Sequence, residues 1–242
     1  MHILQLIEAT LYRHQSSWES DDRPVLYIKG RAERKSSSSP TAYYAIAYGA
    51  EKLGVKCPRR WRSTFCTTDP SASSFFGEWN ENEGIREIQI PPNTVVAACI
   101  DDYNYMPSVV DAMEHYELHD SLRNLGATEY GPEHDRAAIV EKVGEAMRAL
   151  LAIDIRIGSD NGYEQFVSMM TVLDQLAALI PDVIREEFDG ASSFTELVIR
   201  DVKAAFGKDI LLFNDASQIP EGQNYEVWFE GDYEAHLAKK AP

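Results

Sequence analysis

Residues 59–77 of the chain read RRWRSTFCTTDPSASSFFG. The run Arg62–Thr67 is β-prone, and the following Asp69-Pro70 pair is typical of a turn. Small polar residues lead from this turn to two consecutive phenylalanines and a glycine. The stretch therefore predicts a strand that ends in two hydroxyl-bearing residues, Thr67 and Thr68.

The segments on either side of this strand predict further strands and then helices. Helical spacing predicts helices over residues 1–12 and from Pro40 to Gly54. Between them, residues 24–28 are apolar and predict a strand. This strand ends at Lys29-Gly30, and Arg31 follows at its C-terminal edge. Alternating or apolar runs predict four more strands, at residues 85–90, 95–100, 209–213 and 225–229. Helical periodicity covers residues 109–125, 133–153 and 163–180, and a last helix starts with a capping box formed by Ser193 and Glu196. We therefore expect a sheet-bearing domain over residues 1–107 and 208–242, and a helical insertion over residues 108–207.

Composition is that of an ordinary folded protein. Of the 242 residues, 44% are hydrophobic and 26% are charged, which excludes collagenous, disordered and coiled-coil classes. No apolar run approaches the ~20 residues of a membrane span, and residues 1–10 lack the basic start of a signal peptide. The three cysteines are odd in number and widely spaced, which predicts reduced thiols. We expect a cytoplasmic protein with no membrane partner.

Charge is unevenly distributed along the chain. Between Arg23 and Arg62 there are ten Lys or Arg residues against only Glu33 and Glu51, a local balance of +8, within a total of −16. The other residues therefore sum to −24. The basic region indicates either a surface that meets an anion, such as a phosphate-bearing ligand, or a solvated basic face.

Motifs with well-defined chemistry are missing from the sequence. There is no GxGxxG, GxxxxGK[ST], GxSxG or HExxH pattern, which disfavours the common nucleotide-binding and hydrolase folds. His115 and His119 have a spacing that can serve a metal, but no third ligand is evident, and we interpret them as surface histidines. We predict no metal site.

The central stretch resembles a known catalytic element. A strand ending in Cys66-Thr67-Thr68, followed by a turn and then by Ala72 and Phe75, resembles the Ser-Thr-Ser element of the ADP-ribosyltransferases. Cys66 stands where the family has its first serine. The next predicted strand, residues 85–90, is similar to the family's following strand, which also runs into a proline-containing turn.

The family also has an arginine on an early strand and a glutamate on a late one. Residues 25–31 resemble the arginine strand and make Arg31 the preferred candidate, with Arg13 in Leu11-Tyr12-Arg13 as the alternative. Near the end of the chain, residues 224–229 resemble the glutamate strand and nominate Glu226. Asn224 stands two residues before it, where arginine-modifying members have Gln or Glu, so the acceptor stays open.

The resemblance implies an α+β fold with a split, mostly antiparallel sheet of ADP-ribosyltransferase type that carries a helical insertion. It implies that NAD is the substrate, and that ADP-ribose passes to a macromolecular acceptor, either protein or nucleic acid, with release of nicotinamide. The spacing of the basic residues around Arg31 and residues 59–63 is similar to that of bacteriophage-encoded members, for which the site of action would be the host cytoplasm.

The chemistry explains the residue types. Breaking the glycosidic bond of NAD develops positive charge on the ribose, which a carboxylate such as Glu226, with Asn224 nearby, would stabilise. The guanidinium of Arg31 suits the diphosphate, and the Thr67 and Thr68 hydroxyls could hold Glu226 in place. Flat nicotinamide calls for an aromatic wall such as Phe75, Phe76 or Trp79. The cofactor-binding set that the resemblance implies is Arg31, Cys66, Thr67, Thr68, Phe75 and Phe76.

Two other functions are consistent with the sequence. The first is an acidic, non-catalytic binding or inhibitor protein whose negative charge mimics an anionic partner. The second is an NAD glycohydrolase on the same fold, with water as acceptor. Binding of NAD separates the first alternative from the enzyme.

Overall fold

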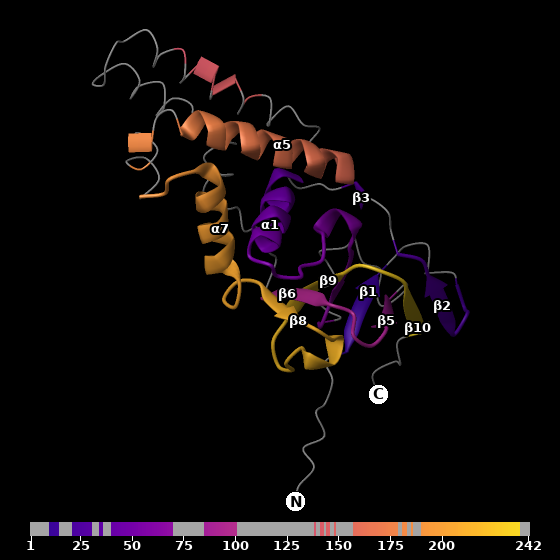
Figure 1. Cartoon of the computed structure of the whole chain (residues 1–242). Coiled ribbons are helices and arrows are strands. Elements are labelled where there is room, and N and C mark those ends of the chain that lie inside the picture. The colour runs from indigo at the N-terminus through magenta and orange to yellow at the C-terminus, as the bar shows by residue number, and fades with distance from the viewer. Residues whose placement is uncertain are drawn as a thin grey trace, which may run out of the picture. The chain divides into compact units, whose positions relative to one another are not determined.

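The computed structural model describes residues 10–14, 21–30, 34–35, 40–69, 85–100, 157–178 and 190–237, together with single positions between 138 and 185. The chain divides into two compact units (Figure 1). Unit 1 consists of residues 1–32, 57–104 and 206–242, and unit 2 of residues 33–56 and 105–205. These ranges differ from the expected domains mainly in residues 33–56, which contain a helix and belong to unit 2.

Unit 1 contains an eight-stranded sheet in the order β2-β10-β5-β1-β4-β9-β6-β8. Every strand pairing in it is antiparallel. The strands are β1 (Leu11–His14), β2 (Val25–Ile28), β4 (Thr64–Thr67), β5 (Ile85–Gln89), β6 (Val96–Ile100), β8 (Leu211–Phe213), β9 (Tyr225–Phe229) and β10 (Tyr233–Leu237). Together with the helices of unit 2, this sheet confirms the predicted α+β class with a mostly antiparallel sheet.

The helix predicted over residues 1–12 is wrong in the part that the structure describes. Residues 11 and 12 were expected in a helix over residues 1–12, yet they belong to β1. Leu11 pairs with Ile88 in the adjacent strand and is buried in the core. Burial of one apolar side chain against a long-range partner outweighs the local helical spacing, because propensity is only a weak preference.

The chain passes directly from β9 to β10 although three strands separate them in the sheet. Four strand spacings amount to about 19 Å, whereas the four steps from Phe229 to Tyr233 span at most about 14 Å. The sheet must therefore bend so that its two halves approach each other. In agreement, the rings of Phe229 and Tyr233 lie 5.6 Å apart, edge to face. Gly231, with φ of 115°, provides the left-handed backbone of the turn.

The core of unit 1 lies on one face of this bent sheet, here called face A. Because side chains alternate along a strand, each strand contributes every second residue to it. Its buried members come from both halves of the sheet and from the segment before β9, and they include Leu11, Leu26, Cys66, Ile88, Val96, Ala98, Ile219, Tyr225, Val227, Phe229, Tyr233 and Ala235. The opposite face is here called face B, and it carries the polar residues described below.

The side chain of Arg86 links the segment before β2 to the sheet through hydrogen bonds. Its side chain is only 1% exposed, and its guanidinium donates to the carbonyl oxygens of Asp21, Arg23 and Ala235. The Asp21 carboxylate lies 3.9 Å away, and its hydrogen bonds with Arg23 hold its pKa at about 2. Arg86 therefore supplies buried carbonyl groups with donors that the sheet itself does not offer.

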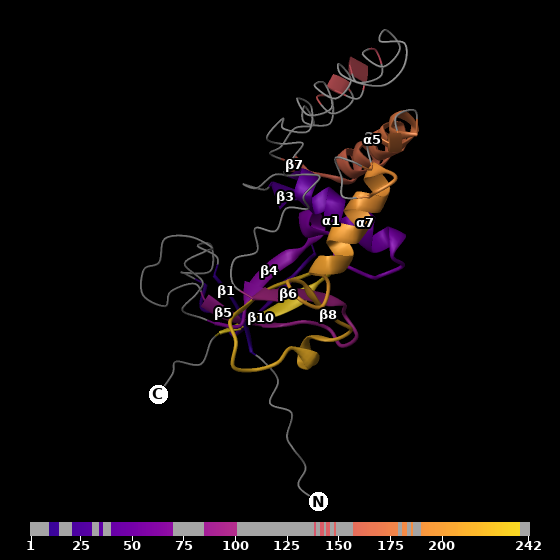
Figure 2. The ribbon, with the colours of Figure 1, turned by 90° about the vertical axis from the view of Figure 1, so that its left-hand side faces the viewer.

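Unit 2 contains three described helices, α1 (Pro40–Lys52), α5 (Asp160–Ala177) and α7 (Phe194–Ala205), and a short two-stranded sheet of β3 (Arg34–Lys35) and β7 (Ile157–Gly158). Helices α1 and α7 lie side by side, as Figure 2 shows. Gly49 permits this contact, because a Cβ there would fall 2.6 Å from a methyl group of Val202. Half of the predicted capping box of α7 is confirmed, since the Glu196 N–H donates to Ser193 Oγ. The Glu196 carboxylate accepts from the N–H of Ser192.

The remaining predicted helices cannot be compared in full. The one over residues 109–125 and most of the one over residues 133–153 lie outside the described residues. Among the helices that are described, none has both the length and the apolar character needed to cross a membrane.

Arg86 provides a test of this architecture. Arg86→Met should lower the free energy of unfolding by about 2–4 kcal/mol, because three carbonyl groups lose their donor. Arg23→Met is the matched control, and it should cost less than about 1 kcal/mol because its side chain is exposed. Urea titration followed by tryptophan fluorescence measures both. Equal losses for the two variants would contradict the role assigned to Arg86.

Candidate functional site

Strands β4 and β9, which carry the threonine and glutamate motifs, lie next to each other at the centre of the sheet, whereas β2, which leads to the preferred arginine, is its first strand. Strand β4 pairs with β1 on one side and with β9 on the other. In the register, Tyr12 faces Thr67, and Thr67 faces Glu226. Directly opposed residues in antiparallel strands project from the same face. Tyr12, Thr67 and Glu226 therefore share face B.

Glu226 forms an ion pair with Arg60 on this face. Arg60 Nη2 lies 2.7 Å from Glu226 Oε1, and the two side chains are 5% and 16% exposed. The Arg60 guanidinium carbon also lies 4.8 Å from the ring centroid of Phe65 and 4.5 Å from that of Trp228. These two rings belong to opposed residues of β4 and β9 and are stacked on each other. The guanidinium is thus held by one carboxylate and two aromatic faces.

The segment before β4 positions Arg60. It contains a 3-10 helix, Arg60–Arg62, and it is tied to β9 and the turn beyond it. The Trp228 indole N–H donates to the Pro58 carbonyl at 3.2 Å, and the Arg59 N–H donates to Glu230 Oε1 at 2.6 Å. These bonds fix the backbone just before Arg60. The position of Glu226 Oε1 is consequently defined by β9 and by this segment together.

A second set of hydrogen bonds organises the chain just before Glu226. Thr68 Oγ1 accepts from the Tyr225 N–H at 2.8 Å and donates to the Gln223 carbonyl at 3.0 Å. The Asn224 amide donates to Asp69 Oδ2 at 2.8 Å. Thr68 and Asn224 therefore join the turn after β4 to the start of β9. This arrangement makes them positioning residues for the backbone that carries Glu226.

The structure brings together four of the predicted site residues: Thr67, Thr68, Asn224 and Glu226. It places Cys66 on face A, because neighbouring residues of a strand project to opposite sides. The Cys66 thiol is completely buried, donates to the Val227 carbonyl and has its pKa raised to about 12 by burial. Cys66 is a core residue in this structure and does not share the face of Glu226.

The two candidate arginines differ in what can be said of them. Arg31, Phe75 and Phe76 lie outside the described residues. Arg13 follows Tyr12 in β1 and so projects from face A, where it donates to the Phe65 carbonyl at 2.5 Å. Arg13 and Glu226 are therefore on opposite faces of the sheet.

Sequence reasoning missed Arg60 as a partner of Glu226. The cluster of basic residues around Arg60 was evident, but no feature of the neighbouring sequence indicates which carboxylate pairs with it. It also missed a row of polar residues on face B. Along this row the register opposes Glu226 to Thr67, Thr67 to Tyr12, Tyr12 to Glu87 and Glu87 to His236. The row crosses five strands, and its Thr67 and Glu226 members are largely buried.

In the part of the chain that the structure describes, no three His, Cys, Asp or Glu side chains are grouped as metal ligands. His115 and His119 lie outside it. The comparisons with known proteins add no relative: no family model, curated protein or solved structure matches this chain.

Burial of the cysteines predicts slow thiol chemistry in the folded protein. Burial raises the pKa of both Cys57 and Cys66 to about 12, and thiolate is the reactive form. At a mildly alkaline pH, iodoacetamide should therefore leave Cys66 unmodified until urea unfolds the protein, as peptide mass spectrometry would reveal. Rapid alkylation of Cys66 in the native state would contradict the burial of its thiol.

The Arg60–Glu226 pair predicts a specific pattern of stability. Glu226→Gln removes the carboxylate that pairs with the buried Arg60 guanidinium and should lower the free energy of unfolding by about 3 kcal/mol. In Arg60→Met/Glu226→Gln both charges are gone, so its loss should be smaller than the sum of the single losses by about 1–3 kcal/mol. The exposed Asp182–Arg185 pair is the control, and Asp182→Asn should change stability by less than about 0.5 kcal/mol. Additive single losses at Arg60 and Glu226 would contradict the pairing.

Proposed function

We propose that the protein is an NAD-dependent ADP-ribosyltransferase in which Glu226 is the catalytic carboxylate. The observation that carries the proposal is the register of β4 against β9, which opposes Thr67 to Glu226 at the centre of the sheet. This is the pairing expected if the threonine and glutamate motifs belong to one site. The resemblance of both segments to the family supports the same reading.

In the proposed reaction the bond between the ribose C1′ and the nicotinamide nitrogen breaks. Its electron pair leaves with nicotinamide, which becomes neutral, and positive charge develops on the ribose. Glu226 stabilises this charge, and the acceptor then forms a bond to C1′ and loses a proton. Arg60 holds one oxygen of Glu226 in place, so the carboxylate does not have to reorient when the charge appears.

The diphosphate of NAD requires a cationic anchor. Arg31 remains the first candidate. Arg13 is less favourable, because its side chain projects from the face opposite to Glu226. Arg60 is already committed to Glu226 and serves as a positioning residue rather than as an anchor.

One observation is equally consistent with the alternative of a non-catalytic binding protein. Glu226 is only 16% exposed and is bound to a buried arginine, an arrangement that a purely structural carboxylate would also have. Removal of the charge from Glu226 must therefore be tested in a way that separates catalysis from folding.

The test compares NAD binding and nicotinamide release in four proteins. In wild type, NAD should raise the thermal midpoint, because a ligand that binds only the folded state stabilises it. Glu226→Gln should still bind NAD, while nicotinamide release measured by chromatography falls by ~10²-fold, as when an electrostatic stabiliser of the transition state is lost. Arg60→Met/Glu226→Gln should be equally inactive, because it lacks the same carboxylate. Glu221→Gln, at an exposed loop position, is the control with wild-type release.

The outcomes divide the hypotheses. Wild-type protein that shows neither a thermal shift nor nicotinamide release at millimolar NAD would support the binding protein. Release of nicotinamide with no label on protein or nucleic acid would support the glycohydrolase. A thermal shift that disappears in Arg31→Ala but persists in Arg13→Ala identifies Arg31 as the anchor, and the reverse result identifies Arg13.

A further inference from the structure

Unit 1 has a pocket at the β2 end of its sheet, lined by residues of β2, of the start of β10 and of the end of β5. Its volume is about 440 Å³, within the range of sites that hold a small molecule or a large side chain. Its floor includes three residues that face one another across three strands: the register opposes Gln89 to Glu234, and Glu234 to Tyr27. The pocket therefore lies partly on face B.

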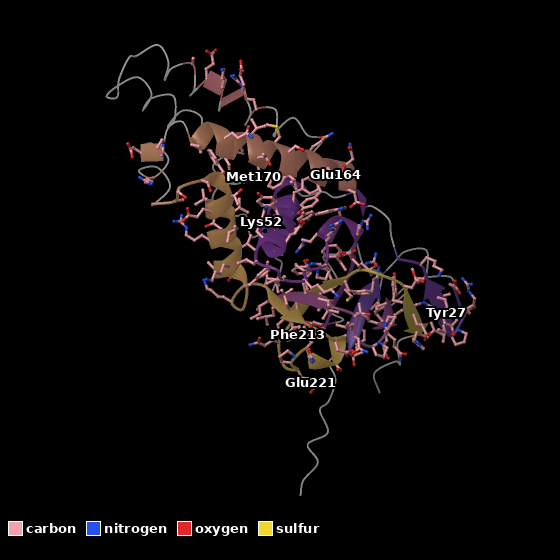
Figure 3. All side chains as sticks on the ribbon, viewed as in Figure 1. Tyr27, Lys52, Glu164, Met170, Phe213 and Glu221 are labelled. Carbon is pink, nitrogen blue, oxygen red and sulfur yellow. The ribbon has the colours of Figure 1, made fainter. Side chains whose placement is uncertain are left out.

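Tyr27 gives the pocket an exposed aromatic surface. Its side chain is 80% exposed on β2, where Figure 3 labels it. Pro91 and Pro92 add apolar surface on the other side, after β5. A ring this exposed contributes little to folding, because little of its area is removed from water. It is available to stack on a ligand.

The charge of the pocket is negative. At the rim, Lys29 Nζ lies 2.7 Å from Asp232 Oδ2, and the Gly30 N–H donates to Asp232 Oδ1, so these two charges offset each other. Glu234 carries the remaining carboxylate, and its Oε2 lies 2.9 Å from His236 Nε2. With a neutral histidine the pocket has a net charge of −1. It is therefore unfavourable for phosphates and nucleotides and favourable for a cation.

Tyr27 and Glu234 together match one chemical group. As directly opposed residues they have Cβ atoms roughly 5 Å apart on the same face. A guanidinium can lie flat on the tyrosine ring while its edge donates two hydrogen bonds to the carboxylate. An ammonium group would use the charge but not the planar shape.

The strand beside the pocket indicates how such a group would be presented. Among the strands that the structure describes, β2 pairs only with β10 and forms an edge of the sheet. An extended segment can add to a sheet edge through its backbone, and alternate side chains then point to one face. A side chain on face B would reach Tyr27.

We propose that this pocket binds an arginine side chain carried on an extended segment of a partner protein, which pairs with β2. The inference does not depend on the NAD reaction, because none of its residues belongs to the proposed catalytic site.

The experiment measures binding of a fluorescein-labelled heptapeptide, Ser-Val-Thr-Arg-Thr-Val-Ser, by fluorescence anisotropy in the absence of NAD. The matched probe has citrulline in place of arginine, which keeps the shape but removes the charge, and it should bind at least ~10-fold more weakly. Tyr27→Ala and Glu234→Gln should each weaken the arginine peptide at least ~10-fold. Tyr27→Phe and Glu221→Gln should bind as wild type does.

Three results would overturn the proposal. The first is no binding of the arginine peptide to wild type at millimolar protein. The second is equal binding of the citrulline peptide, which would show that charge is not recognised. The third is binding of free arginine amide as tight as that of the peptide, which would indicate a small-molecule site without strand pairing. Because Tyr27 and Glu234 are not buried, thermal midpoints close to wild type verify that the variants are folded.

Discussion

The ion pair between Arg60 and Glu226 is the contact on which the centre of unit 1 depends. A guanidinium that is 5% exposed is costly unless its charge is matched and its faces are packed. Glu226 supplies the charge, and Phe65 and Trp228 supply the packing. Because Arg60 lies on the segment before β4 and Glu226 on β9, the pair also fixes the relative positions of the two motifs that define the proposed catalytic site.

Alternation along the strands decides which residues can act together. Face A receives the residues of the core cluster from both halves of the bent sheet. Face B receives Thr67, Glu226, Tyr12, Glu87 and His236 in one row. A shift of register by one residue would exchange the faces. The polar row is therefore a direct consequence of how the core is packed.

The same sheet carries a chemically different surface at its β2 end. There the turn between β9 and β10 comes so close to β2 that a Cβ on Gly30 would lie 2.7 Å from the backbone of Gly231. This approach brings Asp232 to Lys29 and shapes the rim of the pocket. The central site and this pocket differ in what they can bind: the first offers a positioned carboxylate beside hydroxyls, and the second an exposed ring beside a carboxylate.

The sequence alone determined the elements whose signals are local. The apolar runs of β2, β6 and β9 and the cap of α7 were predictable, because strand alternation and helix capping depend on neighbouring residues. Tertiary structure decided the rest. The four residues of β1 form a strand through their pairing with β5. Strand β10 likewise forms through its pairing with β5, on the other half of the bent sheet from β9. The register that puts Cys66 in the core and Thr67 beside Glu226, and the choice of Arg60 as the partner of Glu226, join residues up to 166 positions apart, and contacts over such separations leave no periodic trace in the chain.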